Sequence, residues 1–334
     1  MDNILGKIAA QERLSQEEAK RLILDITERK YSDPQIAGIL AGLQMRGVSV
    51  DELLGMREGL LETGLPVDLS PFRAMDVVGT GGDGKNTFNI STAACLVIAG
   101  AGYPVAKHGN YAASSVSGAS DVIEAHGVTF SADSERHRRN LETCGFTYLH
   151  APLFALGMKY VAPARKALGQ LGMATCFNLL GPLVNPSRPG FQLLGTANLD
   201  QQRLYRHVYR RLGIQYGIVT SVDGYDEISL TSEFKVVTNA EERIYTPAGL
   251  GLPACRPEDL YGGSSKEEAM RIFDSVLDGT ASEARKNTVI ANAAFGIRVM
   301  EPAKSAEECA AIARESLESG KALRVLRVFT EMNH

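Results

Sequence analysis

Residues 77–92 decide the fold of this chain, and they read Val77-Val78-Gly79-Thr80-Gly81-Gly82-Asp83-Gly84-Lys85-Asn86-Thr87-Phe88-Asn89-Ile90-Ser91-Thr92. The β-branched run predicts a strand that ends at Gly79, and the apolar residues 93–101 predict a helix. Glycines let the main chain approach an anion closely, and the N–H groups of a helix's first turn point at it. Ser91 and Thr92 add hydroxyl donors where a helix cap lies. A strand, a glycine loop and a helix N-terminus together indicate a phosphate site.

The loop fits more than one phosphate motif. Gly79-x-Gly81-x-x-Gly84 matches the dinucleotide fingerprint, which also needs an acidic residue about 20 positions later. That region, residues 104–110, is basic, so a nicotinamide cofactor is disfavoured. A P-loop fits as far as Lys85, where Asn86 replaces the required hydroxyl residue, and residues 218–223 form only a poor Walker B strand. A glycine turn without a ligand is the remaining interpretation, and the charges of Asp83 and Lys85 beside the glycines disfavour it.

A second segment, residues 107–121, supplies Lys107, the carboxamide of Asn110 and several hydroxyls within one loop. Such a set suits a sugar that carries several phosphates better than a nucleotide base. The pairing of this loop with residues 79–92 resembles the anthranilate phosphoribosyltransferase family, enzymes of tryptophan biosynthesis. The resemblance continues through Arg165, the Phe-Asn-Leu-Leu-Gly-Pro stretch of residues 177–186 and Asp-Gly-Tyr-Asp-Glu at 223–227, and it covers nearly the whole chain.

The resemblance implies a reaction of 5-phosphoribosyl 1-diphosphate (PRPP) with anthranilate that gives N-(5-phosphoribosyl)anthranilate and diphosphate. The residues that it assigns to PRPP are Gly79, Gly82, Asp83, Thr87, Asn89, Ile90, Ser91, Thr92, Lys107, Ser114, Ser115 and Ala119. It assigns Gly79, Asn110 and Arg165 to anthranilate, while His108 is either a substrate contact or a structural loop histidine. It assigns Ser91, Asp226 and Glu227 to two Mg²⁺ ions, in keeping with the preference of Mg²⁺ for carboxylates and phosphates.

Two departures from the family pattern stand near these motifs. The family commonly has Arg where this chain has Tyr111, and a His-Pro pair where it has Ala155-Leu156. We expect the second departure to lie near the acceptor pocket. Two rival functions remain: a pyrimidine nucleoside phosphorylase, which takes free phosphate and needs no acidic metal pair, and a relative that has lost catalysis and only binds its ligands. The retention of Asp83, Ser91, Lys107, Arg165, Asp226 and Glu227 argues against the relative that has lost catalysis.

Composition narrows the class of protein. The chain has 334 residues, 44% hydrophobic and 22% charged, which is typical of a globular protein with one large and one small domain. A formal net charge of −4 disfavours a nucleic-acid partner. Five scattered cysteines without a Cys-x-x-Cys pair indicate reduced thiols in a cytoplasmic protein. We expect no signal peptide and no membrane span.

Periodicity places a small helical domain first. The apolar periodicity of residues 1–66 predicts a helical bundle. The resemblance implies that about residues 158–186 join this bundle and that the bundle forms the contact of a homodimer. Residues 72–157 and 187–334 predict an α/β domain with a mainly parallel central sheet, a nucleoside phosphorylase/phosphoribosyltransferase-like fold. The expected strands are 75–78, 105–106, 147–149 and 217–221, and residues 158–178 are expected to be helical. Ligands should gather where the parallel strands end.

Overall fold

The computed structural model describes residues 4–112 and 115–334, and it divides the chain into two compact units. A helical unit comprises residues 1–67 and 151–188, and an α/β unit comprises residues 68–150 and 189–334. Both are discontinuous in sequence. Residues 151–157, predicted in the α/β part, belong to the helical unit instead, because Phe154 is buried there and its carbonyl accepts a hydrogen bond from Leu65 N at 2.9 Å.

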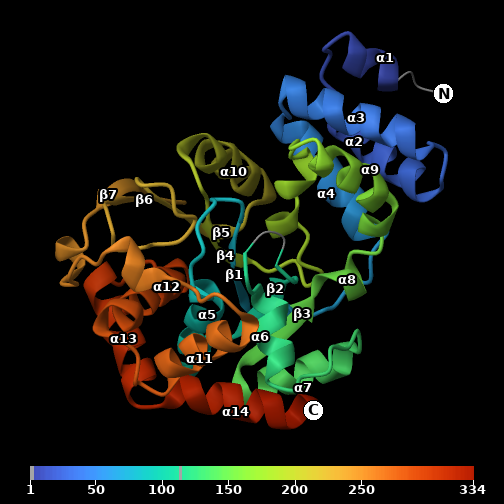
Figure 1. Cartoon of the computed structure of the whole chain (residues 1–334). Coiled ribbons are helices and arrows are strands. Elements are labelled where there is room, and N and C mark those ends of the chain that lie inside the picture. The colour runs from blue at the N-terminus through green and yellow to red at the C-terminus, as the bar shows by residue number, and fades with distance from the viewer. Residues whose placement is uncertain (1–3, 113–114) are drawn as a thin grey trace. The chain divides into compact units, whose positions relative to one another are not determined.

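The helical unit is built from two segments of the chain (Figure 1). Its elements are α1 (Ile4–Ala9), α2 (Gln16–Thr27), α3 (Asp33–Arg46), α4 (Val50–Glu62), α8 (Ala151–Phe154), α9 (Met158–Gln170), η2 (Cys176–Asn178) and η3 (Gly181–Leu183). Helix α2 packs against α4, and α3 packs against α9. The capping box predicted at Ser15 and Glu18 is confirmed. The helix predicted over 158–178 ends at Gln170, and Gly172 then takes a φ of 73°, which a helix cannot contain.

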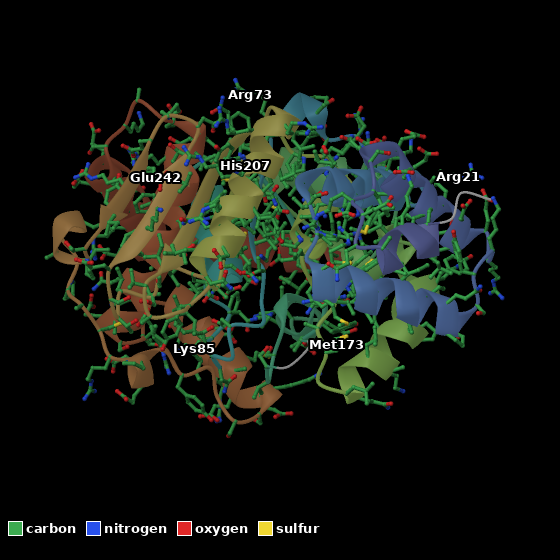
Figure 2. All side chains as sticks on the ribbon, turned by 90° about the horizontal axis from the view of Figure 1, so that it is seen from above. Arg21, Arg73, Lys85, Met173, His207 and Glu242 are labelled. Carbon is green, nitrogen blue, oxygen red and sulfur yellow. The ribbon has the colours of Figure 1, made fainter. Side chains whose placement is uncertain are left out.

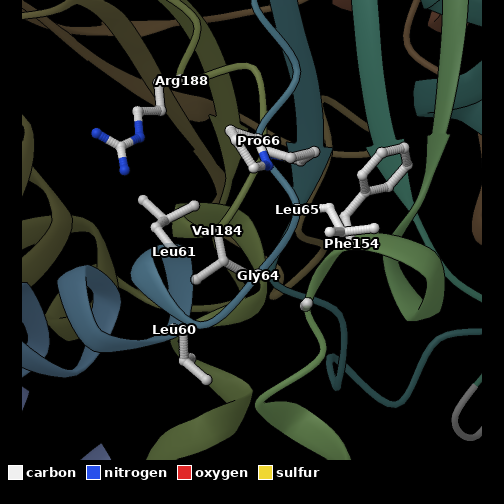
Figure 3. A pocket seen from close by; sticks show the side chains of 10 residues that line it. Leu60, Leu61, Gly64, Leu65, Pro66, Phe154, Val184 and Arg188 are labelled. Carbon is white, nitrogen blue, oxygen red and sulfur yellow. The ribbon is translucent and has the colours of Figure 1, made fainter. Parts of the chain in front are cut away.

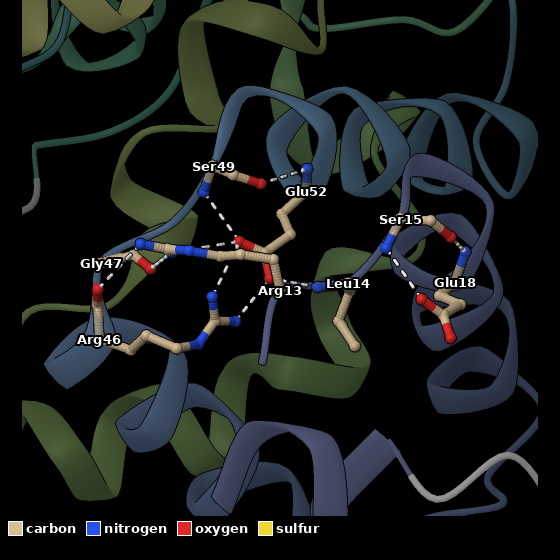
Figure 4. Close-up of polar contacts among 8 residues, drawn as sticks. All are labelled: Arg13, Leu14, Ser15, Glu18, Arg46, Gly47, Ser49 and Glu52. Carbon is tan, nitrogen blue, oxygen red and sulfur yellow. Dashed lines mark hydrogen bonds and ion pairs between the residues drawn. The ribbon is translucent and has the colours of Figure 1, made fainter. Parts of the chain in front are cut away.

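A buried carboxylate joins three parts of this bundle (Figure 4). Glu52 is 0% exposed and accepts hydrogen bonds from Leu14 N at 2.9 Å and from Ser49 N at 2.8 Å. The guanidinium of Arg46 supplies two more donors, at 2.5 and 3.3 Å. Glu52 therefore caps α4 while it ties the end of α3 and the segment before α2 to it.

The α/β unit is built on one seven-stranded sheet in the order β3-β2-β1-β4-β5-β6-β7. Its strands are β1 (Met75–Gly79), β2 (Val105–Gly109), β3 (Phe146–His150), β4 (Phe191–Gly195), β5 (Gln215–Ser221), β6 (Phe234–Thr238) and β7 (Glu242–Tyr245). Strands β1 to β5 pair in parallel, and β6 and β7 continue the sheet antiparallel. The mainly parallel sheet predicted from the sequence is confirmed, although β4, β6 and β7 were not predicted.

Helices enclose this sheet (Figure 1). They are α5 (Ile90–Gly100), α6 (Ala119–Ala125), α7 (Ser134–Cys144), α10 (Leu199–Leu212), α11 (Lys266–Leu277), α12 (Glu283–Met300), α13 (Ala306–Glu318) and α14 (Lys321–Asn333), with short turns η1 (Ser70–Phe72), η4 (Ala248–Leu250) and η5 (Pro257–Leu260). Helix α5 packs against α12, α13 and α14 as well as the sheet, so apolar residues all around it become core. No helix of the described ranges is long and apolar enough to cross a bilayer.

Helix α10 is fastened to the antiparallel edge of the sheet. Gln202 donates from its side chain to the carbonyls of Ile218 at 3.3 Å and Lys235 at 3.1 Å. Arg206 forms an ion pair with Glu242 of β7 at 2.7 Å, and Figure 2 shows His207 of α10 and Glu242 of β7 on this part of the unit. These contacts hold β5 in place. Its carboxyl end leads into residues 222–227, the acidic loop of the candidate site.

Candidate active site

The chain order of the strands creates a switch point between β1 and β4. From β1 the chain moves outward through β2 and β3, and it then returns to the other side of β1 to form β4 and β5. In open α/β sheets, ligands bind outside the carboxyl ends of the strands at such a point. Here the last paired residues are Gly79 of β1 and Gly195 of β4.

Both glycines are needed because the acidic loop lies directly against them. A Cβ on Gly79 would lie 2.3 Å from Oδ2 of Asp226, and a Cβ on Gly195 would lie 1.5 Å from the Asp226 carbonyl oxygen. Both separations are shorter than a carbon–oxygen van der Waals contact. Because Gly79 and Gly195 have no side chain, the loop that follows β5 can pack against the ends of β1 and β4.

The glycine loop after β1 turns through three left-handed residues. Gly81, Gly82 and Gly84 have φ values of 66°, 75° and 73°, which residues with a side chain rarely adopt. Asp83 stabilises the turn, since its Oδ1 accepts a hydrogen bond from Lys85 N at 3.0 Å. The ammonium of Lys85, labelled in Figure 2, lies 4.6 Å from the centre of the Tyr225 ring. The glycine loop and the acidic loop thus contact each other on their outer side.

Three carboxylates meet between these two loops. Asp83, Asp226 and Glu227 each offer an oxygen, and these atoms lie within 4.8 Å of one another. Asp226 is 6% exposed, its Oδ2 accepts a hydrogen bond from Gly81 N at 2.6 Å, and its own N–H donates to Asp83 Oδ2 at 3.5 Å. Burial, with the nearby charge of Asp83, raises the pKa of Asp226 to about 6. Burial and the two neighbouring carboxylates also raise the pKa of Glu227 well above its ordinary value.

This cluster suits a hard divalent cation. Mg²⁺ binds oxygen ligands and usually takes one or two carboxylates together with substrate phosphates and waters. Oε2 of Glu227 is buried and has no hydrogen-bond partner among the described residues, although a buried carboxylate oxygen without one is costly. A cation between the three groups would offset their mutual repulsion and give that oxygen a ligand bond.

Lys107 brings a positive charge to the same edge. Strand β2 extends to Gly109, so Lys107 and His108 lie in the strand, not in the loop after it as expected. Lys107 is 2% exposed, and its ammonium donates to the Val77 carbonyl at 2.7 Å and to Ser91 Oγ at 3.4 Å. It also counteracts the rise in the pKa of Glu227. The ammonium is thereby directed at the junction of β1 and α5.

The start of α5 carries the other predicted donors. Ser91 accepts from Lys107, Asn89 donates to the Ser117 carbonyl at 3.2 Å, and Thr87 forms an isolated bridge with Tyr261. Ile90 is fully buried, and so is Thr92, whose Oγ1 has no hydrogen-bond partner among the described residues. Gly82 is exposed in the loop. The start of α5 thus contacts Lys107 of β2 and the segment before α6, and its assignment to PRPP stays a prediction.

The segment after β2 is described only in part. His108 is 4% exposed, and its N–H donates to Asp76 Oδ1 at 3.1 Å. Asn110 is exposed, and Ser115 donates to the Ser117 carbonyl at 3.5 Å. Ala119 begins α6. Ser114, also predicted to bind PRPP, lies outside the described residues.

Arg165 belongs to the helical unit, on α9. Its Nη2 donates to Asn178 Oδ1 at 3.2 Å, and its guanidinium lies 5.9 Å from the centre of the Phe177 ring. Burial lowers the pKa of this arginine. It lines an open hollow of about 500 Å³ together with Ala162, Lys166, Gly169, Gly172, Met173, Ala174, Thr175 and Asn178. The hollow is large enough for a small aromatic acid.

Known proteins match the whole chain. The family model of the glycosyl transferase family helical bundle domain matches residues 2–64, and that of the a/b domain of the same family matches residues 72–323. The chain is 56% identical to anthranilate phosphoribosyltransferase of Phocaeicola vulgatus and 53% identical to that of Bacteroides thetaiotaomicron, with 100% of each chain covered. The chain belongs to the anthranilate phosphoribosyltransferase family.

Solved structures of the family have the same fold. The enzyme from Thermus thermophilus matches with a TM-score of 0.92 at 35% identity, over 99% of each chain. The enzyme from Saccharomyces cerevisiae in complex with PRPP and Mg matches with a TM-score of 0.88 at 27% identity, over 98% of this chain and 96% of that one. The same yeast enzyme in complex with 4-fluoroanthranilate matches with a TM-score of 0.86.

The family departure at Ala155 lies in a packed part of the helical unit. Ala155 is 9% exposed and borders a cavity of about 10 Å³, room for about one water molecule. Figure 3 shows the surrounding side chains, which include Leu60, Leu65, Phe154, Val184 and Arg188. This cavity cannot hold an anthranilate ring. The position of Ala155 near the acceptor pocket stays a prediction.

Two features of the site were missed in the sequence. Asp83 was assigned to PRPP alone, whereas its carboxylate joins Asp226 and Glu227, more than 140 positions later. Thr175 carries no motif in the sequence. It is 4% exposed, its Oγ1 has no hydrogen-bond partner among the described residues, and it lines the same hollow as Arg165. An Asp within a glycine turn was the only available signal for the first, and the second gave none.

Proposed function

We propose that this chain transfers the 5-phosphoribosyl group of PRPP to the amino group of anthranilate, a step of tryptophan biosynthesis. The observation that carries the proposal is the gathering of Asp83, Asp226 and Glu227 against the glycine loop at the switch point of the sheet. Three buried or half-buried carboxylates beside a phosphate loop serve a metal–diphosphate substrate. Membership of a family whose yeast member binds PRPP and Mg supports the same assignment.

The donor half of the site is proposed to lie in the α/β unit. The glycine loop and the first turn of α5 present N–H groups, and Lys107 adds a fixed charge. We assign to PRPP the residues Gly79, Gly82, Asp83, Thr87, Asn89, Ile90, Ser91, Thr92, Lys107, Ser115 and Ala119, and Ser114 by sequence alone. Ser91, Asp226 and Glu227, joined by Asp83, would hold Mg²⁺, proposed as two ions. When bound, Mg²⁺ supplies neutralisation of the negative charge on the diphosphate.

The acceptor half is proposed to involve Arg165, Asn110, Gly79 and His108. The planar guanidinium of Arg165 matches a carboxylate with two parallel hydrogen bonds. The amino nitrogen of anthranilate attacks C1 of the ribose while the C1–O bond breaks and its electron pair leaves with the diphosphate. The nitrogen then loses a proton. An aromatic amine is neutral at pH 7, so holding it in line with the breaking bond should contribute more than a strong base.

Lys107 and the loop amides act where charge develops in this reaction. Negative charge grows on the departing diphosphate, and preorganised donors stabilise it without having to reorient. The contacts of Lys107 with Val77 and Ser91 hold its ammonium in place before substrate arrives. The proposed contribution of these groups is therefore stabilisation of the leaving group.

Homodimer formation through the helical unit and a cytoplasmic location are also proposed. The helical unit leaves Met45 and Leu171 each 81% exposed, which is unusual for large apolar side chains and suits a protein contact. All five cysteines are unpaired thiols, in keeping with a reducing compartment. Light scattering of the purified protein would test the dimer, and replacement of Met45 and Leu171 by Ser would then favour the monomer.

The two rival functions make different products. Mass spectrometry would follow the protein with anthranilate, PRPP and Mg²⁺, and in parallel with uridine or thymidine and inorganic phosphate. The proposal expects phosphoribosylanthranilate and diphosphate in the first reaction and no free base in the second. Release of a pyrimidine base would indicate the phosphorylase. Binding of PRPP without turnover would indicate the relative that has lost catalysis.

A further inference from the structure

His150 has an environment that the proposed reaction does not use. It ends β3, beside Gly109 of β2, at the carboxyl edge of the sheet, and it is only 6% exposed. Its Nδ1 lies 2.8 Å from Ser120 Oγ, and this hydroxyl lies 2.7 Å from the hydroxyl of Tyr148. Ser120 is 0% exposed, and Tyr148 is 3% exposed. The three side chains form a buried polar chain, and such a chain is costly unless each of its members is satisfied.

Aromatic rings fix the orientation of the imidazole. The Phe130 ring stacks on it with centroids 4.2 Å apart and an angle of 11° between the planes. Tyr111 meets it edge-on, with centroids 5.0 Å apart and an angle of 76°. The hydroxyl of Tyr111 donates to Glu124 Oε1 at 3.0 Å, which holds that ring against the histidine. Offset-stacked and edge-on pairs are the favoured arrangements of such rings.

The partners of His150 adjoin two residues of the proposed site, one at each end of the connection between β2 and α6. Tyr111 directly follows Asn110, and Ser120 directly follows Ala119, and both Asn110 and Ala119 belong to the proposed site. The N–H of Ser120 donates to the Asn110 carbonyl at 3.1 Å, so the two ends already touch. One imidazole therefore contacts both ends, one through its nitrogen and the other through its ring.

We propose that His150 is a positioning residue for the phosphoribosyl donor: it holds Ser120 and Tyr111, and thereby their neighbours Ala119 and Asn110, in place at the carboxyl edge of the sheet. This inference rests on the proposed function. It gives Tyr111, which replaces the arginine common in the family, a role in positioning. A phenylalanine at 150 would preserve the ring contacts but lose the hydrogen bond to Ser120. An asparagine would preserve an acceptor and donor near Nδ1 but lose the ring.

Protonation of His150 should loosen these contacts. Burial lowers the pKa of His150, and Glu124 partly opposes this effect. Among the described residues, Tyr111 is the other titratable group whose ring meets the imidazole, and the Tyr148 hydroxyl is linked to it through Ser120. The folded chain thus favours the neutral ring, which is present at pH 7. As the pH falls below the ordinary histidine value of about 6.5, protonation acts against the folded arrangement.

The test compares His150→Phe and His150→Asn with the unchanged protein. The measurements are KM for PRPP, KM for anthranilate, kcat, and the unfolding temperature, each from pH 5.5 to 8. The loss of one neutral hydrogen bond corresponds to about a three- to tenfold change in a binding constant. We expect His150→Phe to raise KM for PRPP by this factor at pH 7.5 with little change in KM for anthranilate, and His150→Asn to recover part of the loss. Ser120→Ala should raise KM for PRPP by the same factor as His150→Phe, and the double variant should raise it no further.

The pH profile separates positioning from general stability. The ratio of KM for PRPP between His150→Phe and the unchanged protein should fall toward one as the pH drops, because protonation removes the advantage of the histidine. Unchanged KM for PRPP in His150→Phe, or a lower unfolding temperature with all kinetic constants preserved, would overturn the proposal. If the unchanged protein makes no phosphoribosylanthranilate, the proposed function fails instead. Calorimetry of PRPP binding to the same variants then still tests the role of His150.

Discussion

At the scale of single residues, Glu227 connects stability with metal binding. Glu227→Gln removes an ionisable group from the three-carboxylate cluster, so at a pH where Glu227 is ionised the metal-free variant should unfold at a temperature about 2–4 °C higher. The same change should raise the Mg²⁺ concentration for half-maximal rate by about ten- to a hundredfold, the factor for a lost charge-assisted contact. Calorimetric unfolding without metal and a magnesium titration of the rate measure the two effects. Unchanged magnesium dependence would remove Glu227 from the metal site.

The sign of the pH effect follows from the raised pKa of Asp226. Between its ordinary value and about 6, the folded protein binds more protons than the unfolded chain, so the stability of the metal-free protein should fall as the pH rises through this range. Protons and Mg²⁺ compete for the same oxygens, and the apparent affinity for Mg²⁺ should therefore weaken below about pH 6.

Arg165 separates the two substrates. Arg165→Ala should remove charge-assisted hydrogen bonds to the anthranilate carboxylate, about 1.5–3 kcal/mol, and lower kcat/KM for anthranilate by about 10- to 100-fold. Affinity for PRPP, measured by calorimetry, should stay nearly unchanged. Lys166→Ala is the matched control, since Lys166 is a neighbouring cation that lines the same hollow. A fall in PRPP affinity in Arg165→Ala, or equal losses in both variants, would contradict this assignment.

At the scale of elements, the switch point depends on a missing side chain. Gly195→Ala would place a Cβ 1.5 Å from the Asp226 carbonyl oxygen, so the acidic loop must move. We expect a loss of activity of about a hundredfold or more, because a displacement near 1 Å can already have such an effect. Gly190→Ala, just before the same strand, is the control, since nothing lies within 4 Å of its added Cβ. Comparable activity of the two variants would show that the loop does not need this contact.

The helical bundle depends on Glu52 in a different way. Burial alone would raise the pKa of Glu52, but hydrogen bonds from Arg46, Leu14 and Ser49 lower it overall. Its stabilising contribution is therefore present above the ordinary glutamate value, about 4.3, and is lost as the pH falls below it. Glu52→Ala leaves Arg46 buried without its partner and should lower the free energy of unfolding by about 3–5 kcal/mol. Urea unfolding at pH 7 measures this effect, and a loss below about 1 kcal/mol would contradict it.

The sequence predicted some elements well and others not at all, for physical reasons. The strand at 75–79 and the helix after it were predictable because β-branched residues, glycines and an apolar run follow one another there. Strand β4 has only five residues, and its role depends on β1 pairing beside it. The end of α9 was misplaced because Leu171 and Met173 continue an apolar pattern past Gly172.

At the scale of the whole molecule, the site brings together residues that lie far apart in the sequence. The pair Asp226-Glu227 could be predicted from its own motif, and Lys107 from its neighbours. The approach of Asp83 to that pair follows only from the order of the strands, which brings the ends of β1 and β5 to one edge of the sheet. The contacts of His150 with Ser120 and Tyr111 likewise depend on the pairing of β2 with β3.

The most direct test of the account follows anthranilate fluorescence in the presence of the purified protein, PRPP and Mg²⁺. We predict a steady fall in fluorescence that requires all three components, stops when a chelator removes Mg²⁺, and resumes when Mg²⁺ is restored. We also expect one diphosphate to be released for each anthranilate consumed. Constant fluorescence with every component present, in protein that binds PRPP by calorimetry, would contradict the proposed function.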